Sequence, residues 1–235
     1  MSSKKMRAAC AGLAGAAAIV AFPAGAGATN FSNQAAITGG ANAVASTYPS
    51  TINVSGLTGS ITKARATLFG VTGNGTTRMQ ILLVGPGGQS VVLMRNACGD
   101  TINGATLAFD DAASGVLPAG SCAGNSGTFK PTDYDPSDNA FTAPAPAKPY
   151  GSTMSVFNNT QPNGTWRLFL EDDVIGGIRS HAIGGGWSLD LDTAAPPANA
   201  ATGIVAKKKK CAKRKGAKRK PGAKKKCRKK KKKKK

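Results

Sequence analysis

The chain has 235 residues and a formal net charge of +21, and this charge is concentrated at one end. Residues 207–235 contain 21 Lys or Arg and no acid, whereas residues 29–206 contain 8 basic and 11 acidic side chains. The distribution excludes a uniformly basic folded protein. It indicates a near-neutral domain that carries a separate polycationic segment.

Residues 1–28 have the order of features that is typical of a secretory signal peptide. A basic start is followed by a run of small apolar residues, and an Ala-Gly-Ala sequence precedes Thr29 as a cleavage site. The apolar run is shorter than the roughly 20 residues needed to span a bilayer. We therefore expect an exported protein that is secreted, either extracellular or associated with the cell envelope.

Residues 29–192 are predicted to form one domain without helices. Short runs alternate apolar with polar residues, and turn-forming pairs such as Asn-Gly and Pro-Gly separate them. The predicted strands span residues 51–55, 61–72, 78–84, 89–95, 105–109, 152–157, 165–171 and 186–192. About eight short strands with no helix predict an all-β fold, an antiparallel β-sandwich.

Two cysteines lie inside this domain, Cys98 and Cys122. In an oxidising compartment we expect them to form a disulfide, the alternative being two buried free thiols. A metal site at these cysteines is not favoured, because the chain has one histidine and no C-x-x-C motif. The pairing of Cys211 and Cys227, which lie in the basic segment, is left open.

A long irregular segment over residues 114–150 interrupts the strands, and loops of that length are often functional. Asp133, Asp135 and Asp138 lie close together in it. Calcium prefers about six to eight oxygen ligands, so these aspartates are a candidate calcium site. Solvated loop acids are the alternative interpretation.

The aromatic residues of the same segment form a second candidate site. Most aromatic residues of the chain fall on alternating strand positions, where core packing is the default interpretation. Tyr134, Phe141 and Tyr150 do not. Exposed loop aromatics on a β-sandwich are a candidate contact for a glycan.

The last two predicted strands, within residues 163–192, carry the clearest alternation in the chain. The residues that share one face of each strand are Trp166, Leu168 and Leu170 in the first strand and Trp187, Leu189 and Leu191 in the second. This period-two pattern predicts two half-buried strands, each of which begins with a tryptophan. We expect these six residues to be structural core residues and not ligand platforms.

The spacing in this region, G-x-W-x-L-x-L-x-D followed by I-x-x-x-W-x-L, resembles the end of the P domain (Homo B domain) of subtilisin-like proprotein convertases. The strand and turn MQILLVGPGG, residues 79–88, add a second similarity to that family. The resemblance extends over about residues 31–192 and implies a jelly-roll sandwich of the galactose-binding-like type. In convertases this domain stabilises and tunes the attached serine protease.

The chain departs from the family at one position that bears on calcium. P domains often carry an acid just before the strand that matches residues 79–84, whereas Arg78 stands there in this chain. The positive charge of Arg78 would repel a cation bound near it.

No catalytic constellation is evident in the sequence. The one histidine, His181, lies in a Gly-rich segment between the last two strands, and the chain has no G-x-S-x-G motif. A protease domain is also missing from the 235 residues. We therefore expect His181 to be a solvated turn residue and the chain not to be an enzyme.

Residues 193–206 are a Pro/Ala-rich linker, and residues 207–235 are predicted to be a disordered tail because like charges repel and nothing apolar can be buried. Such a polycation binds polyanions with release of counterions. No aromatic residue is interleaved, so base stacking and specific nucleic-acid binding are not expected. The basic residues predicted to contact a polyanion include Lys207, Lys213, Arg214, Lys218, Arg219, Lys224, Arg228 and Lys235.

These observations predict an exported, non-catalytic, P-domain-like binding or interaction module of the cell envelope. The tail would retain it on an anionic envelope polymer or a membrane surface, with extracellular nucleic acid as a further polyanion and a merely solubilising tail as the alternative. The domain would bind a glycan or a secreted protease. The alternative function is an accessory or regulatory domain associated with a secreted subtilisin-like serine endopeptidase.

Overall fold

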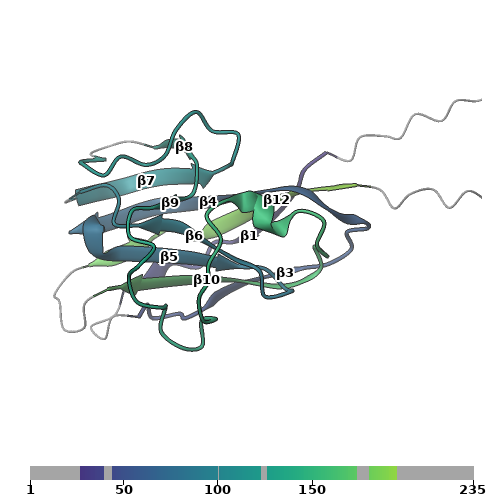
Figure 1. The fold of residues 1–235 in the computed structure, drawn as a ribbon, viewed down its shortest axis with the longest axis horizontal. Coiled ribbons are helices and arrows are strands. Elements are labelled where there is room, and N and C mark those ends of the chain that lie inside the picture. Colours follow the sequence, from purple (N-terminus) through teal and green to yellow (C-terminus); the bar gives the residue numbers. More distant parts are fainter. Residues whose placement is uncertain (1–26, 40–43, 100, 123–125, 174–179, 195–235) are drawn as a thin grey trace, which may run out of the picture. The chain divides into compact units, whose positions relative to one another are not determined.

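The computed structural model describes residues 27–39, 44–99, 101–122, 126–173 and 180–194, which are mostly β-strands (Figure 1). The predicted signal peptide up to residue 26, the linker from residue 195 and the basic tail lie outside the described residues. The strands are β1 (Thr29–Asn33), β2 (Ile37–Thr38), β3 (Ser50–Val54), β4 (Ser60–Asn74), β5 (Met79–Val84), β6 (Ser90–Arg95), β7 (Thr101–Phe109), β8 (Gly127–Phe129), β9 (Thr132–Asp133), β10 (Gly164–Asp172), β11 (His181–Ile183) and β12 (Trp187–Ala194).

Helical structure in this part of the chain is limited to two 3-10 helices. They are η1 (Thr76–Arg78) and η2 (Met154–Phe157). Within the described residues, no helix has the length and apolar character required to cross a membrane. The predicted all-β sandwich is therefore confirmed.

The larger sheet has seven strands, with β1, β12, β4, β11 and β2 in that order; β7 also pairs with β4, and β8 pairs with β7. The 15-residue strand β4 organises this sheet, because it pairs with β12, with β11 and with β7. Trp187 lies opposite Leu68 and Leu189 opposite Ala66 across β12 and β4. Apolar residues of neighbouring strands therefore face the core in continuous rows.

The smaller sheet has five strands in the order β3, β10, β5, β6 and β9. Every residue of β5 and β6 is buried, since their inner face meets the main core and their outer face is covered as well. Phe141, from the long segment after β9, packs with Leu82, Val92 and Phe169 in a second apolar cluster on that outer face. Burial on both faces explains why residues 79–84 form an almost continuous apolar run.

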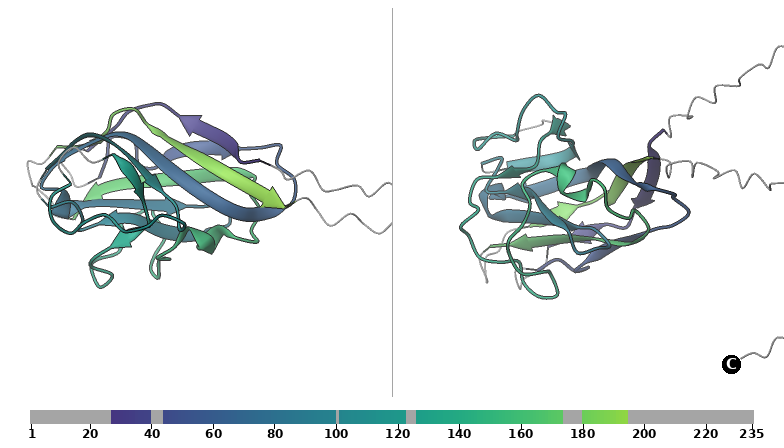
Figure 2. Two further views of the ribbon diagram at one scale, coloured as in Figure 1. Left: turned by 90° about the horizontal axis from the view of Figure 1, so that it is seen from above. Right: turned by 45° about the vertical axis from the view of Figure 1, so that its right-hand side comes forward.

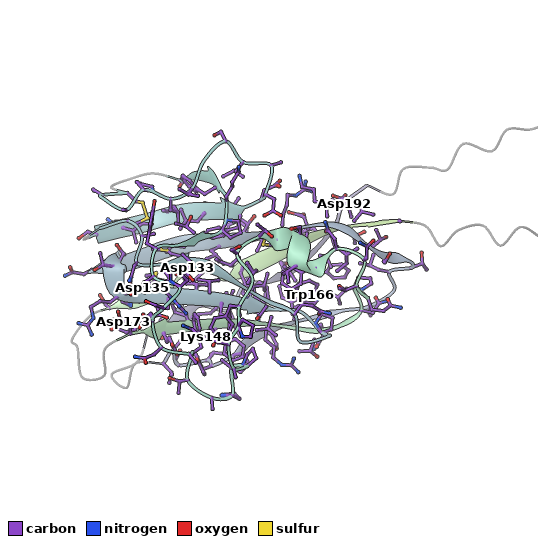
Figure 3. The ribbon with its side chains drawn as sticks, in the orientation of Figure 1. Asp133, Asp135, Lys148, Trp166, Asp173 and Asp192 are labelled. Atoms are coloured by element: carbon purple, nitrogen blue, oxygen red, sulfur yellow. A yellow bond between two sulfur atoms is a disulfide. The ribbon has the colours of Figure 1, made fainter. Side chains whose placement is uncertain are left out.

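The two tryptophans of the predicted core are fully buried. Trp166 donates its indole N–H to the Pro162 carbonyl oxygen at 3.0 Å and packs edge-on against Phe157 (Figure 3). Trp187 donates to the Ser50 hydroxyl at 3.0 Å and so connects β12 of one sheet with β3 of the other. The leucines at positions 168, 170, 189 and 191 are at most 1% exposed and belong to the same core.

The disulfide between Cys98 and Cys122 is confirmed. Both cysteines are buried, and the bond joins the end of β6 to the segment that follows β7. It closes a loop with a sequence separation of 24 residues.

Several details of the predicted strands are wrong. Residues 152–157 were predicted to form a strand, but η2 lies there, and the Asp111 carboxylate accepts the backbone N–H groups of Met154 and Ser155 at 2.7 and 2.8 Å. The short strands β1, β2, β8, β9 and β11 were not predicted. The pairs β6–β9 and β7–β8 are parallel and not antiparallel, and β12 continues two residues beyond the predicted domain end at residue 192.

The first and last described strands lie side by side. β1 pairs with β12 in an antiparallel register that places Thr29 opposite Leu191. Figure 2 shows that β1 begins and β12 ends at the same end of the sandwich.

Candidate functional site

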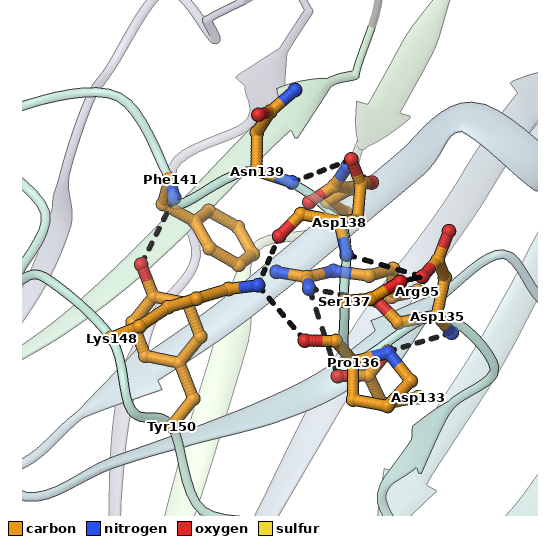
Figure 4. A network of polar contacts seen from close by, with 11 residues as sticks. Arg95, Asp133, Asp135, Pro136, Ser137, Asp138, Asn139, Phe141, Lys148 and Tyr150 are labelled. Atoms are coloured by element: carbon orange, nitrogen blue, oxygen red, sulfur yellow. Dashed lines mark hydrogen bonds and ion pairs between the residues drawn. The ribbon is translucent and has the colours of Figure 1, made fainter.

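The three aspartates of the candidate calcium site lie at and just after β9, beside the end of β6 (Figure 4). Their carboxylates accept hydrogen bonds from neighbouring residues. Asp133 accepts the backbone N–H of Asp135 at 3.0 Å, Asp135 accepts the hydroxyl of Ser137 at 2.6 Å, and Asp138 accepts the side-chain amide of Gln80 at 2.7 Å. The hydrogen bond from Ser137 lowers the pKa of Asp135.

Cationic side chains lie at this loop. One guanidinium nitrogen of Arg95 is 3.8 Å from Asp133 and donates to the Asp135 carbonyl oxygen at 3.1 Å, while the Lys148 ammonium donates to the carbonyl oxygens of Pro136 and Asp138. Among the described residues, no three or more acidic, His or Cys side chains are grouped so that they could hold a metal ion. Calcium at these aspartates therefore stays a prediction of the sequence.

Two of the three aromatics of the candidate glycan contact, Phe141 and Tyr150, pack against other residues of the protein. Phe141 is 4% exposed, and its ring centroid lies 5.2 Å from the Arg95 guanidinium carbon. The Tyr150 ring lies 5.9 Å from that carbon, and its hydroxyl accepts the Phe141 backbone N–H at 2.9 Å. Arg95 is fully buried between them. The expectation is therefore wrong for Phe141, whereas Tyr150 is partly buried and Tyr134 is 45% exposed.

The acidic run at the end of β10 faces basic and hydroxyl partners. Arg78 contacts Asp172 at 2.7 Å and Asp173 at 3.3 Å, so one positive charge offsets part of the negative charge of this run. The Tyr48 hydroxyl lies 2.7 Å from the Glu171 carboxylate. Burial is the main cause that raises the pKa of Glu171 and also that of Asp173, whose position Figure 3 marks.

The predicted solvated turn at His181 is wrong. His181 is 2% exposed and begins β11, which pairs with β4 and β2. Its Nδ1 is 3.8 Å from the Asp172 carboxylate, and within the described residues its Nε2 has no hydrogen-bond partner. Burial lowers the pKa of the imidazole, so the neutral form is favoured. Among the described residues the groups recorded at this ring are the Asp172 carboxylate and the backbone at Asn74 and Gly75, so the geometry of a Ser-His-Asp triad is not formed by them.

A groove that the sequence did not predict lies on the outer face of the larger sheet. It has a volume of about 470 Å³ and is lined by Asn30, Ser32, Gln34, Phe69, Gly185 and Ser188. Phe69 is 37% exposed and lies on β4 after Arg65 and Thr67, which occupy alternate positions of that strand. This alternation was the signal in the sequence that Phe69 points away from the core.

The predicted polyanion contacts, Lys207 to Lys235, lie outside the described residues.

Several basic residues of the described domain form ion pairs within it. Each of four contacts a carboxylate: Lys63 with Asp110 at 2.8 Å, Arg65 with Asp192 at 3.9 Å, Arg78 with Asp172 at 2.7 Å and Arg95 with Asp133 at 3.8 Å. These contacts offset much of the positive charge that the domain could offer to a polyanion.

Comparison with known proteins gives a limited result. No model of a known protein family matches the chain, and no curated protein matches it. Two solved structures are similar to part of it: the serine protease of Aeromonas sobria, and a chain from the complex of that serine protease with its chaperone. The identities are 16% and 17%, and the TM-score is 0.35 for both. The matches cover 70% and 72% of this chain but only 26% of the other chain in each case.

Proposed function

We propose that this chain is an exported, non-catalytic, P-domain-like binding module, and that its basic tail retains it on anionic polymers of the cell envelope. The observation that carries the proposal is the separation of charge. Residues 207–235 hold 21 basic side chains and no acid, whereas four basic side chains of the domain contact carboxylates within the domain itself. Attraction to a polyanion is therefore assigned to the tail.

The binding role of the domain is supported by what its polar groups do. Its single histidine is buried beside Asp172, and the acids of the long segment are used as hydrogen-bond acceptors in turns. The outer face of the larger sheet instead has an open groove with an exposed phenylalanine, Phe69. Such a surface suits recognition of a ligand better than chemistry on it.

A second candidate function is an accessory domain of a secreted subtilisin-like serine endopeptidase. The observation in its favour is the motif resemblance, since the two strands with the P-domain spacing are β10 and β12, whose tryptophans are buried in the core. The two candidates differ in the partner of the domain. A pulldown from envelope extract separates them: the first predicts a wall polymer or glycan, and the second predicts a protease.

Retention by the tail is tested by fractionating cells that express three forms of the protein. These are the full-length chain, a chain in which the sequence of residues 207–235 is scrambled, and a chain that ends before residue 207. The scrambled form keeps all 21 charges and is the matched control for sequence-specific recognition.

We expect the full-length and scrambled forms in the envelope fraction and the truncated form in the medium, because attraction between opposite charges does not depend on the order of the lysines. Envelope retention of the truncated form would show that the sandwich holds the protein there. Loss of the scrambled form would show that the tail is recognised by its sequence.

A further inference from the structure

The two sheets of the sandwich differ in what covers their outer faces. On the smaller sheet, Phe141 and partly buried Tyr48 and Tyr150 pack with residues of β5, β6 and β10. On the larger sheet the alternate residues of β1, β12 and β4 include Asn30, Ser32, Ser188 and Thr67, and the groove at Phe69 opens there. The larger sheet therefore provides the open face of the described domain.

The polar side chains of this groove are available for binding. Ser32 and Ser188 lie directly opposite each other on β1 and β12. Ser188 is 4% exposed, and Ser32 and Gln34 line the groove beside it. Hydroxyl and amide groups in such a position can both donate hydrogen bonds to a ligand and accept them from it.

One polar group of the groove is held in place by the protein. The side-chain amide of Asn30 donates to the Asp190 carboxylate at 2.9 Å. This contact fixes which end of the Asn30 amide is engaged, so its carbonyl oxygen and its second N–H stay available. The groove therefore contains both donors and acceptors.

The glycines of the turn before β12 shape the groove around Phe69. A Cβ atom at Gly185 would lie 2.9 Å from the Cβ of Phe69, which is closer than real Cβ atoms approach. A Cβ at Gly186 would overlap the Asn33 carbonyl oxygen and lie 2.7 Å from the Gln34 Cα. Glycine at both positions therefore lets Phe69 and the end of β1 approach the turn and form the two sides of the groove.

We propose that this groove binds an uncharged saccharide unit, and this inference rests on the proposed function because it names the ligand of the same binding module. The groove residues within the described part of the chain include no Lys, Arg, Asp or Glu, so the lining complements a ligand without charge. A sugar ring presents C–H groups on one face and hydroxyls around its edge. Its face would stack on Phe69, and its hydroxyls would bond to Asn30, Ser32, Gln34 and Ser188.

The size of the groove agrees with one or two sugar units. Its volume of about 470 Å³ lies within the range of roughly 300–1,000 Å³ found for small-molecule sites. A peptide would use the groove differently. It would add to β1, the edge strand among the described strands of this sheet, through backbone hydrogen bonds and would depend little on the Phe69 ring.

The test is calorimetric titration of the full-length chain with soluble neutral oligomers of glucose, mannose, galactose and N-acetylglucosamine. The titrations are run in about 1 M salt, where the screening length falls to about 3 Å and the tail no longer attracts distant charges. The variants are Phe69→Ala and Gly185→Ala. Their matched controls are Tyr134→Ala, which removes an aromatic that is 45% exposed, and Gly115→Ala, where an added Cβ meets nothing within 4 Å.

We expect at least one of these oligomers to bind, and Phe69→Ala to weaken it about tenfold or more, the size expected for loss of one stacked ring. Gly185→Ala should also weaken binding, because its methyl group displaces Phe69. The two control variants should bind like the wild type. Gly115→Ala should keep the wild-type unfolding midpoint, whereas Gly185→Ala should lower it through the contact with Phe69 and Tyr134→Ala should lower it through loss of the hydrogen bond to the Leu117 carbonyl oxygen.

The proposal is overturned if none of the oligomers binds in high salt, or if binding survives Phe69→Ala. Binding that is lost in Tyr134→Ala would instead assign the sugar to the long segment. These outcomes leave the fractionation result untouched, since that experiment depends on the tail. Failure of the saccharide site and failure of tail-dependent retention can therefore be told apart.

Discussion

Trp187 provides a sharp test of how the two sheets are held together. It is fully buried on β12, and its indole N–H donates at 3.0 Å to the hydroxyl of Ser50, which is 1% exposed on β3. Truncation of a buried tryptophan to alanine costs about 3–5 kcal/mol in unfolding free energy. Trp187→Phe keeps an aromatic ring but loses the hydrogen bond and leaves a buried hydroxyl with one donor fewer, for which we expect about 1–3 kcal/mol.

The hydrogen bond can be isolated with a double-mutant cycle, measured by equilibrium urea unfolding. We expect Trp187→Phe and Ser50→Ala to couple by about 1 kcal/mol, because each change removes the same bond. Trp166→Phe is the matched control, since the Trp166 indole donates to Pro162 and not to Ser50, and its effect should add to that of Ser50→Ala.

Two results would refute this reasoning. Wild-type stability of Trp187→Ala would show that the residue is not in the core. Full additivity of Trp187→Phe with Ser50→Ala would show that the bond between the sheets contributes nothing.

Three further predictions concern the disulfide and two buried ionisable groups. Replacement of Cys98 and Cys122 by serine should lower the unfolding free energy by roughly 3–4 kcal/mol for a loop of this size, and an unchanged urea midpoint would contradict this. Burial raises the pKa of Glu171 above its ordinary value of 4.5, so the folded state binds more protons at this carboxyl than the unfolded state does. The wild type should therefore lose stability relative to Glu171→Gln as the pH rises above about 4.5. Parallel pH profiles of stability for the two proteins would oppose this. Burial lowers the pKa of His181 below 6.5, so the unfolded state binds more protons at this imidazole than the folded state does. The wild type should therefore lose stability relative to His181→Gln as the pH falls below about 6.5. A stability difference between the two proteins that does not change with pH would count against this.

The sequence predicted the features that depend on local alternation. Apolar residues alternate along β10 from Trp166 and along β12 from Trp187, and this period predicted that they lie in the core. The apolar run at residues 79–84 also predicted a strand. The sequence did not show that both faces of this strand are buried, because Phe141, which covers the outer face, comes from a distant loop.

The features that the sequence did not predict depend on contacts between distant segments. Residues 152–157 alternate like a strand, but Asp111, more than 40 positions earlier in the chain, accepts the first N–H groups of a 3-10 helix there. His181 lies between two Gly-rich stretches, and the pairing of its strand with β2 and β4, which buries it, cannot be read from the local sequence. The burial of Arg95, a charged residue at a strand end, also could not be predicted, because the two rings that cover it come from the long segment.

The candidate groove shows the same division. The outward position of Phe69 follows from the alternation of β4. The residues that complete the groove come from β1 and from the turn before β12, and β1 was not predicted as a strand. Only the pairing of the first and last strands brings them together.

The most direct test of the account is the salt dependence of binding to a purified anionic wall polymer, measured for the full-length chain and for a chain without residues 207–235. If six or more tail charges engage, the affinity of the full-length chain should fall by about 10³-fold or more between about 50 and 200 mM salt. The truncated chain should bind weakly at every salt concentration, because basic side chains of the domain contact its own carboxylates. Tight, salt-insensitive binding by both forms would contradict retention by the tail.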